Sequence, residues 1–318
     1  MAAEYDVIIV GGGPAGLSAA ATIVRQDHKV VLFDSKEYRN AKSKHMHTVA
    51  TWDHRDPSDF REAAKADYDR YGCVEVVDAN VESLEKGEDG LFHATSNGEK
   101  YTAKKVVLAT GVEDIFPDIP GYAENWVSSI FHCMYCHGWE EKDTPSAGVL
   151  ATGDLANPVP ALHFARQVLR MSKSVTLYTD GNETFAKDLE AVLEAAPEKA
   201  PVNIDTRKLS KLSKGSERAQ VVLHFDDGAS ATEAFLASKP KTRLRGTLHE
   251  QLGLELSPAK LIKASPPFNQ TSVQGVFAAG DCTNPMQTVT QALYSGTCTG
   301  AGAPSQIQAE QYGHKGIF

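Results

Sequence analysis

The sequence predicts an α/β fold, with helices packed on both faces of a mainly parallel sheet. Two observations support this prediction: short apolar runs without polar alternation, which are typical of strands buried on both faces, and helix-like segments that come after them. The 318 residues suffice for two domains, each with its own hydrophobic core. Hydrophobic residues make up 42% and charged residues 23%, which excludes a disordered chain or a coiled coil.

The chain opens with the order of elements found in a parallel strand–helix–strand unit. The apolar run Tyr5–Val10 predicts a buried strand, the Ala-rich stretch Leu17–Gln26 a helix, and Lys29–Phe33 a second strand. A glycine-rich segment, residues 11–16, joins the first strand to the helix. This context makes the glycine pattern far more specific than the same motif would be alone.

The glycines have the spacing G-x-G-x-x-G, which binds the pyrophosphate of a dinucleotide. Gly11 permits the tight turn, Gly13 lets the backbone approach the pyrophosphate, and Gly16 lets the helix pack against the strand. The N-terminus of the helix supplies N–H donors and the positive end of a dipole. Asp34 comes directly after the second strand, where an acid accepts hydrogen bonds from an adenosine ribose. We therefore expect a dinucleotide at this turn.

The next part of the chain predicts an antiparallel excursion and two further buried strands. In order, its elements are a helix over Pro57–Tyr71 capped by Asp56, strands over Val74–Val81 and Leu91–Thr95, a hairpin turn at Asn97-Gly98, and a strand over Lys104–Thr110. Much later, Gly275–Asp281 predicts another buried strand, and Gln287–Gln308 a helix of small residues.

The charge balance and the length of the apolar runs limit the partners. The chain has 32 Lys and Arg against 41 Asp and Glu, a net charge of −9, with no basic block to bind nucleic acid or an anionic membrane. No run approaches the roughly 20 apolar residues that span a bilayer. Residues 1–6 carry no basic leader or cleavage site. We expect a cytoplasmic protein that acts on small molecules.

Two of the five cysteines form the motif Cys133-Met134-Tyr135-Cys136, flanked by His132 and His137. Cysteines at this spacing, at a turn entering a helix, can form a disulfide, and a helix dipole with a neighbouring histidine lowers a thiol pKa. The thiolate is the form that reacts in exchange. The motif therefore favours redox chemistry in a reducing compartment.

Three alternatives to a redox disulfide remain open. Cys-x-x-Cys-His matches the attachment motif of c-type haem, which requires export and a haem-sized pocket. The four Cys and His side chains could be zinc ligands, but adjacent residues of one short segment cannot all converge tetrahedrally. The cysteines could also be buried and inert. We favour the redox disulfide and expect no metal.

The glycine turn, the closure Ala109-Thr110-Gly111, the Cys-x-x-Cys motif and the pair Gly280-Asp281 together resemble the low-molecular-weight thioredoxin reductase family of FAD proteins. The resemblance covers essentially the whole chain. It implies two Rossmann-like, three-layer dinucleotide-binding domains, the second inserted in the first. Residues 1–114 and 246–318 would form the FAD domain, and residues 115–245 the insert that carries the Cys-x-x-Cys motif.

The resemblance also implies the FAD contacts and a homodimer. The contacts are Gly11, Gly13, Ala15, Gly16, Asp34, His45, Thr48, Ala109, Gly111, Asp281, Gln287 and Val289. Among them, Asp281 would bond the ribityl or pyrophosphate region of FAD.

The insert lacks the glycine pattern with which this family binds NADPH. The equivalent stretch is residues 148–160. If Gly153 takes the first glycine position, Leu155 falls on the second and Pro158 on the third. A side chain then occupies the place where backbone must approach phosphate, and Asp154 adds a negative charge.

The basic cluster that neutralises a 2′-phosphate is expected directly after the next strand, Ser174–Tyr178. It is absent, because the first Lys or Arg beyond that strand is Lys187. We therefore expect no NADPH bound in the usual mode. Asp180 could hold the ribose of NADH, which stays a minor alternative.

The residue after the second cysteine is usually Asp in the reductases, and here it is His137. This difference, the absent NADPH motifs and the loop 42–54 resemble specifically the fungal gliotoxin-type dithiol oxidases, which close disulfides in epidithiodioxopiperazine metabolites. The resemblance implies that a substrate thiolate attacks Cys133, that Cys136 delivers electrons to FAD, and that O₂ is reduced to H₂O₂. His137, or more weakly His132, would be the general base.

Such an activity would serve biosynthesis of the metabolite or self-protection against it. Two other functions stay open. One is a thioredoxin reductase-like enzyme that uses NAD(P)H or another electron donor, which would bleach the flavin rapidly. The other is a flavoprotein redox sensor, which would consume no O₂ with a dithiol.

Overall fold

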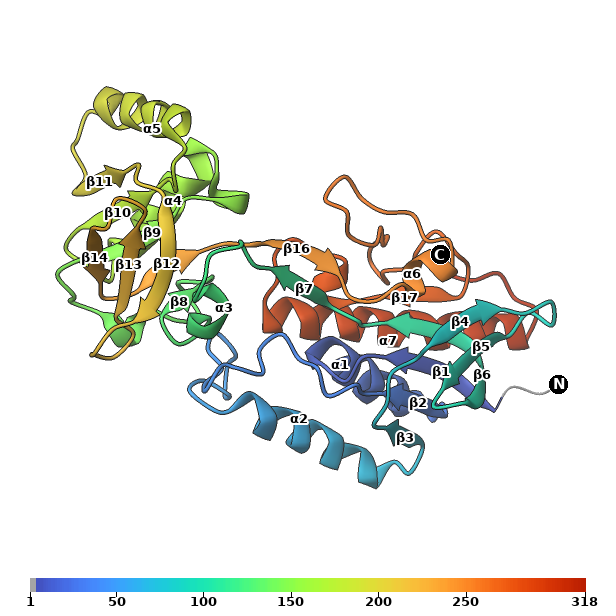
Figure 1. Ribbon diagram of the computed structural model, residues 1–318. Coiled ribbons are helices and arrows are strands. Elements are labelled where there is room, and N and C mark those ends of the chain that lie inside the picture. The colour runs from blue at the N-terminus through green and yellow to red at the C-terminus, as the bar shows by residue number, and fades with distance from the viewer. Residues whose placement is uncertain (1–3) are drawn as a thin grey trace. The chain divides into compact units, whose positions relative to one another are not determined.

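The computed structural model describes residues 4–318, and the chain divides into two compact units. Unit 1 comprises Met1–Glu113 and Arg243–Phe318, and unit 2 comprises Asp114–Thr242. Unit 1 is thus assembled from both ends of the chain, and unit 2 is inserted into it. The strands β7 (Val112–Ile115) and β16 (Lys241–Leu244), which carry the chain between the units, pair with each other (Figure 1).

Unit 1 is built on a sheet of strand order β3-β2-β1-β6-β5-β4, and β17 also pairs with β6. Its strands are β1 (Tyr5–Val10), β2 (Val30–Phe33), β3 (Val74–Val77), β4 (Ser83–Lys86), β5 (Phe92–Ser96), β6 (Glu99–Leu108) and β17 (Val276–Ala278). The strands β3, β2, β1, β6 and β17 pair in parallel, whereas β4, β5 and β6 pair antiparallel. The predicted α/β class is confirmed.

The helices of unit 1 cover this sheet. They are α1 (Pro14–Ile23), α2 (Pro57–Ala66), α6 (Leu248–Gln251), α7 (Val289–Gln311) and the 3₁₀ helices Val24–Gln26, Asp67–Arg70 and Gly280–Cys282. Asp56 caps α2 as predicted, because its side chain accepts a hydrogen bond from the Ser58 backbone N–H.

The two ends of the chain meet where α1 packs along α7 (Figure 1). A Cβ on Gly296 would overlap the carbonyl oxygen of Ala15, so glycine is required for this close approach. The Ser18 hydroxyl donates to the Leu293 carbonyl at 2.8 Å across the same interface. The small residues predicted for the late helix therefore allow two helix backbones to lie in contact.

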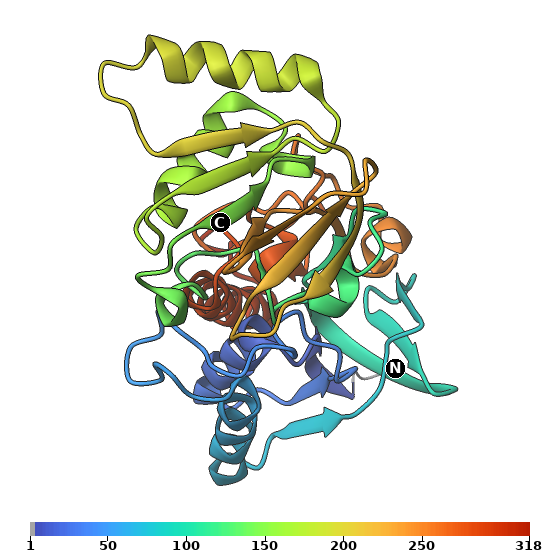
Figure 2. The ribbon, with the colours of Figure 1, turned by 60° about the vertical axis from the view of Figure 1, so that its left-hand side comes forward.

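Unit 2 contains a parallel sheet of order β11-β10-β9-β15-β8 and an antiparallel sheet of order β12-β13-β14. The parallel strands are β8 (Ile130–Phe131), β9 (Ala147–Leu150), β10 (Val175–Tyr178), β11 (Val202–Asp205) and β15 (Leu236–Ser238), and the antiparallel strands are β12 (Leu209–Lys214), β13 (Val221–Phe225) and β14 (Ser230–Glu233). The helices are α3 (Tyr122–Asn125), α4 (Pro158–Val168), α5 (Glu183–Ala195) and the 3₁₀ helices Trp139–Glu141 and Gly153–Leu155. Helix α5 runs alongside β11 (Figure 2).

Two of the differences from the sequence prediction lie in the antiparallel part of the unit 1 sheet. Strand β4 was not predicted, and β6 begins at Glu99 rather than Lys104. The reason is the tight turn at Asn97-Gly98, which pairs Ser96 directly with Glu99 and so extends the hairpin ladder. Among the described helices, none has both the length and the apolar character needed to cross a bilayer.

Candidate functional site

Most of the predicted FAD contacts gather at one edge of the sheet in unit 1. Val10 at the end of β1 pairs with both Phe33 and Leu108, and Leu108 pairs with Ala278, always in parallel register. All four strands therefore end at the same edge, where parallel α/β sheets bind their ligands. The residues that leave the strands at this edge include Gly11, Asp34, Ala109, Gly111 and Asp281, and Ala15 of α1 packs there against Ala109. Val289 is the first residue of α7.

The glycine turn has the shape that a bound pyrophosphate requires. Gly11 has φ +118°, and a Cβ there would overlap the carbonyl oxygen of Ala109. A Cβ on Gly16 would overlap the carbonyl oxygen of Gly11. By contrast, nothing in the described part of the chain lies within 4 Å of a Cβ built on Gly13. The first and third glycines thus close the turn, and the second leaves space at the N-terminus of α1 for a phosphate.

Asp34 is held in place by three hydrogen bonds and is only 1% exposed. Its carboxylate accepts from the Lys36 backbone N–H at 3.0 Å, the Tyr38 hydroxyl at 2.6 Å and Lys65 Nζ at 2.5 Å. Burial raises the pKa of Asp34, but the hydrogen bonds from Lys65 and Tyr38 outweigh it, so that the pKa lies below its ordinary value. These contacts fix an ionised carboxylate directly after β2, where a parallel dinucleotide-binding fold carries its ribose-binding acid.

A further residue at this edge, Arg39, is one that the sequence does not predict. Its Nη1 lies 3.1 Å from Asp281 Oδ2 and 2.5 Å from Gln287 Oε1. Arg39 therefore joins the loop after β2 to two of the predicted FAD contacts. No local pattern could indicate this, because the partners are separated by more than 240 residues.

His45 and Thr48 lie outside the strand register that brings the other predicted contacts together. Both are in the loop between β2 and α2, after Asp34 in the chain. The ring of His45 stacks on that of His54, with centroids 3.9 Å apart, and His47 lies beside them.

The predicted redox pair lies in unit 2 as a Cys133–Cys136 disulfide with a Cα–Cα distance of 5.2 Å. The backbone N–H groups of Cys136 and His137 both donate to the Cys133 carbonyl, at 3.2 and 3.0 Å, and form the turn. Tyr135, between the two cysteines, is 71% exposed. The expectation that this turn enters a helix is wrong, since the three-residue 3₁₀ helix Trp139–Glu141 comes next instead. The expected helix dipole is therefore absent from the residues that come directly after this turn.

Two imidazoles flank the disulfide, and aromatic rings hold each of them. The ring of His137 stacks on Phe131 with centroids 5.0 Å apart and planes 9° apart. The ring of His132 stacks on Trp126 at 5.4 Å and 19°. Both histidines are half-buried. The turn therefore combines a disulfide with two imidazoles whose rings are oriented by aromatic stacking.

The β9–α4 turn of unit 2 is filled by its own side chains. Leu155, at the position of the second glycine, is 2% exposed and packs in the hydrophobic core. Asn157 caps α4 by accepting from the Val159 backbone N–H at 3.1 Å. At the end of β10, the Asp180 carboxylate accepts from Lys208 Nζ at 2.8 Å and from the Leu209 N–H at 2.9 Å.

Comparisons with known proteins agree with this architecture. The profile of the family described as pyridine nucleotide-disulphide oxidoreductase matches residues 5–296. The thioredoxin reductase tcpT of Claviceps purpurea is 41% identical over 316 residues, 98% of this chain and 97% of its own. The thioredoxin reductase aclD of Aspergillus oryzae is 40% identical over 311 residues, 96% of this chain and 98% of its own.

Solved structures give the same result. An oxidoreductase from Agrobacterium tumefaciens has a TM-score of 0.84 at 32% identity and covers 96% of this chain and 98% of its own. The structure of HlmI has a TM-score of 0.84 at 29% identity, with 97% and 94% covered. The chain therefore belongs to the pyridine nucleotide-disulphide oxidoreductase family, as a thioredoxin reductase-like oxidoreductase similar to fungal members.

Proposed function

We propose that this protein is an FAD-dependent dithiol oxidase that converts a small-molecule dithiol to an intramolecular disulfide, with O₂ as the final acceptor and H₂O₂ as the second product. The observation that carries the proposal is an oxidised Cys133–Cys136 pair in a unit whose nucleotide turn is filled by Leu155. Electrons then enter from a dithiol rather than from NADPH. We expect the enzyme to act as a cytoplasmic homodimer, in biosynthesis of or self-protection against a gliotoxin-like metabolite.

Two exchange steps transfer the electrons to the enzyme. The first substrate thiolate attacks Sγ of Cys133, the Cys133–Cys136 bond breaks, and Cys136 leaves as a thiolate. The second thiolate attacks the substrate sulfur in this mixed disulfide, which forms the product and releases Cys133 as a thiolate. The substrate loses two electrons and two thiol protons, and the enzyme pair gains the two electrons.

His137 is our candidate for the base that accepts a thiol proton, because it is the next residue after Cys136 and Phe131 fixes its ring. His132, stacked on Trp126, is the weaker candidate. We expect replacement of His137 by Ala to lower turnover by about 100-fold. The loss should diminish as the pH rises and more of the substrate ionises without a base.

The residues at the sheet edge of unit 1 fit FAD. The space at Gly13 and the N-terminus of α1 would receive the pyrophosphate, Asp34 the adenosine ribose, and Asp281 the ribityl or pyrophosphate region. A bound FAD supplies the two-electron acceptor that regenerates the disulfide and the place where O₂ is reduced to H₂O₂.

Oxygen uptake with a panel of small dithiols tests the proposal. The wild-type protein should consume O₂ and release H₂O₂, whereas the Cys136→Ser variant should lose turnover and keep its bound flavin. The Cys73→Ser variant is the control, since Cys73 lies in unit 1 and is free. Loss of flavin from Cys136→Ser would mean that the cysteine is structural.

The relatives named thioredoxin reductases support a second candidate, a reductase supplied by NAD(P)H or another donor. Stopped-flow mixing with NADPH or NADH distinguishes the two. Rapid bleaching of the flavin would refute the oxidase. If neither nucleotide bleaches the flavin and no dithiol drives O₂ uptake, the results favour a flavoprotein redox sensor.

A further inference from the structure

Three histidines lie together in the loop that joins β2 to α2. His45, His47 and His54 each offer a ring nitrogen, and these nitrogens all lie within 4.8 Å of one another. We call these three residues the histidine cluster. The sequence alone predicts no metal in this loop, and it indicates His45 only as an FAD contact.

The backbone of the loop explains the cluster. Met46 pairs antiparallel with Arg55, the Met46 N–H donates to the Arg55 carbonyl, and the His54 N–H donates to the Met46 carbonyl, both at 2.7 Å. This pairing brings residues 45–47 beside residues 54 and 55, so that the three imidazoles lie together. Met46, between His45 and His47 in the chain, is buried. The cluster is therefore built by the register of the loop.

The rings are arranged in a way that suits a shared ligand. Those of His45 and His54 stack with their planes 24° apart. Nδ1 of His47 lies 3.3 Å from Asp53 Oδ1. In metal sites a carboxylate in this position orients the imidazole and raises its basicity as a ligand.

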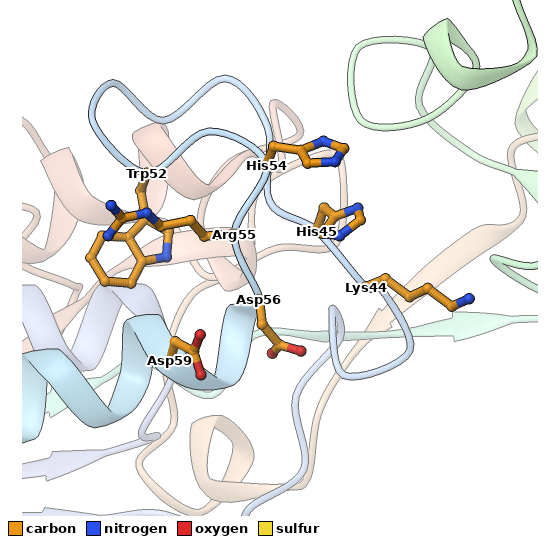
Figure 3. A pocket seen from close by; sticks show the side chains of 7 residues that line it. All are labelled: Lys44, His45, Trp52, His54, Arg55, Asp56 and Asp59. Atoms are coloured by element: carbon orange, nitrogen blue, oxygen red, sulfur yellow. The ribbon is translucent and has the colours of Figure 1, made fainter.

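A pocket of about 540 Å³ opens beside the cluster, and His45 and His54 form part of its wall (Figure 3). Acidic and basic groups both line it: Lys44, Arg55, Asp56 and Asp59, with Trp52. The guanidinium of Arg55 lies over the Trp52 ring, 4.7 Å from its centroid. Figure 3 shows the Lys44 side chain directed away from the two imidazoles. The pocket therefore adjoins two of the three imidazoles.

We propose that the histidine cluster binds a divalent cation of the late first transition row, with Zn²⁺ as the representative. Imidazole nitrogen is a preferred ligand of Zn²⁺, Ni²⁺ and Cu²⁺. Tetrahedral zinc holds its nitrogens at about 2.0–2.1 Å, which sets them about 3.3 Å apart. Since the ring nitrogens lie within 4.8 Å of one another, each nitrogen–nitrogen distance needs to shorten by at most about 1.5 Å. Three protein ligands leave a fourth position for an exchangeable ligand such as water, as in catalytic zinc sites.

This inference does not rest on the proposed oxidase activity. The proposed zinc site uses the ring of His45, which the family resemblance also implies as an FAD contact. The test is therefore made on the flavin-loaded protein, with any affinity tag removed, by equilibrium dialysis against Zn²⁺ and measurement of both bound zinc and bound flavin.

We expect one equivalent of Zn²⁺ to bind at micromolar or lower concentration while the flavin is retained. The His54→Ala variant should bind at least about tenfold more weakly, and Asp53→Asn about tenfold more weakly. The control His314→Ala, an exposed histidine outside the cluster, should bind as the wild type does. His54→Gln repeats the test with a side chain of similar size if the alanine variant folds poorly.

Other results would overturn the inference. These are no stoichiometric zinc at micromolar concentration, zinc that binds only when flavin is lost, or equal weakening by His54→Ala and His314→Ala. A melting temperature that Zn²⁺ raises in the wild type but not in His54→Ala would provide independent support, and a rise in both would contradict it.

Discussion

The β1–α1 turn of unit 1 and the β9–α4 turn of unit 2 connect a buried parallel strand to a helix, yet they differ at the same position. In unit 1 the second glycine, Gly13, has open space beside it. In unit 2 that position is Leu155, whose side chain is buried in the core. One turn presents backbone to a ligand and the other fills its space with a side chain. The same strand–turn–helix connection can therefore be closed by packing in one unit and left open in the other.

The acids after the second strands show the same contrast. Asp34 accepts from Tyr38 and Lys65, and its carboxylate lies beside Gly12 of the glycine turn. The carboxylate of Asp180 accepts hydrogen bonds from Lys208 and from the Leu209 N–H, at the start of β12 in the same unit. NADH binding through Asp180 would have to replace these contacts.

The largest loss of stability is expected from a substitution at Gly16, where the turn of unit 1 leaves no room for a side chain. In Gly16→Ala the new Cβ overlaps the Gly11 carbonyl oxygen, so the backbone must move. We expect the free energy of unfolding to fall by about 3 kcal/mol, with loss of bound flavin. Urea denaturation and the flavin content of the purified protein measure both. A stable, flavin-loaded variant would show that α1 does not need this close approach.

The corresponding substitution in unit 2 should lower the free energy of unfolding without changing flavin binding. Leu155→Ala leaves a cavity in the core and should cost about 3 kcal/mol of unfolding free energy. The bound flavin per folded protein should stay at the wild-type level, because Leu155 belongs to unit 2. Flavin loss without a change in the urea midpoint would contradict the packing role.

Gly13→Val should produce the opposite pattern to Leu155→Ala. The backbone at Gly13, with φ −78° and ψ −179°, suits any L-residue, and its surroundings are open. The unfolding free energy should therefore change little, while the flavin dissociation constant rises at least about tenfold because the side chain enters the phosphate space. Fluorescence titration of the apoprotein with FAD measures this. Unchanged affinity would remove the glycine turn from the FAD site.

The smallest effect concerns the pH dependence of the Asp34 network. Because its folded pKa lies below the ordinary value, ionised Asp34 stabilises the native state above about pH 4, and this contribution is lost as the pH falls through the folded pKa. Asp34→Asn should thus be less stable than the wild type at pH 7, with a difference that shrinks below about pH 4. A difference that stays constant down to pH 2 would show that the charge contributes nothing.

Much of the fold could be predicted because its causes are local. The apolar run Tyr5–Val10, the Asn97-Gly98 turn and the Asp56 cap each act within a few residues of chain. Strand β4 escaped prediction because its residues, Ser83–Lys86, are mostly exposed and its pairing with β5 supplies the order. The expected helix after Cys136 failed for a similar reason, since the spacing of two cysteines does not specify the backbone conformation beyond the turn.

By itself, the sequence determined the glycine spacing at residues 11–16, the adjacency of Cys133, Cys136 and His137, and the absence of that glycine spacing in unit 2. Only the tertiary structure decided that Lys65 and Tyr38 bond to Asp34, that Arg39 contacts Asp281, and that three histidines of one loop lie together. The physical reason is the separation of the partners along the chain. Turn and strand patterns arise from the backbone of neighbouring residues, whereas the Arg39–Asp281 contact exists only after the parallel register has brought distant strand ends to one edge. The Asp34 contacts and the histidine cluster depend on how the chain after β2 folds back on itself.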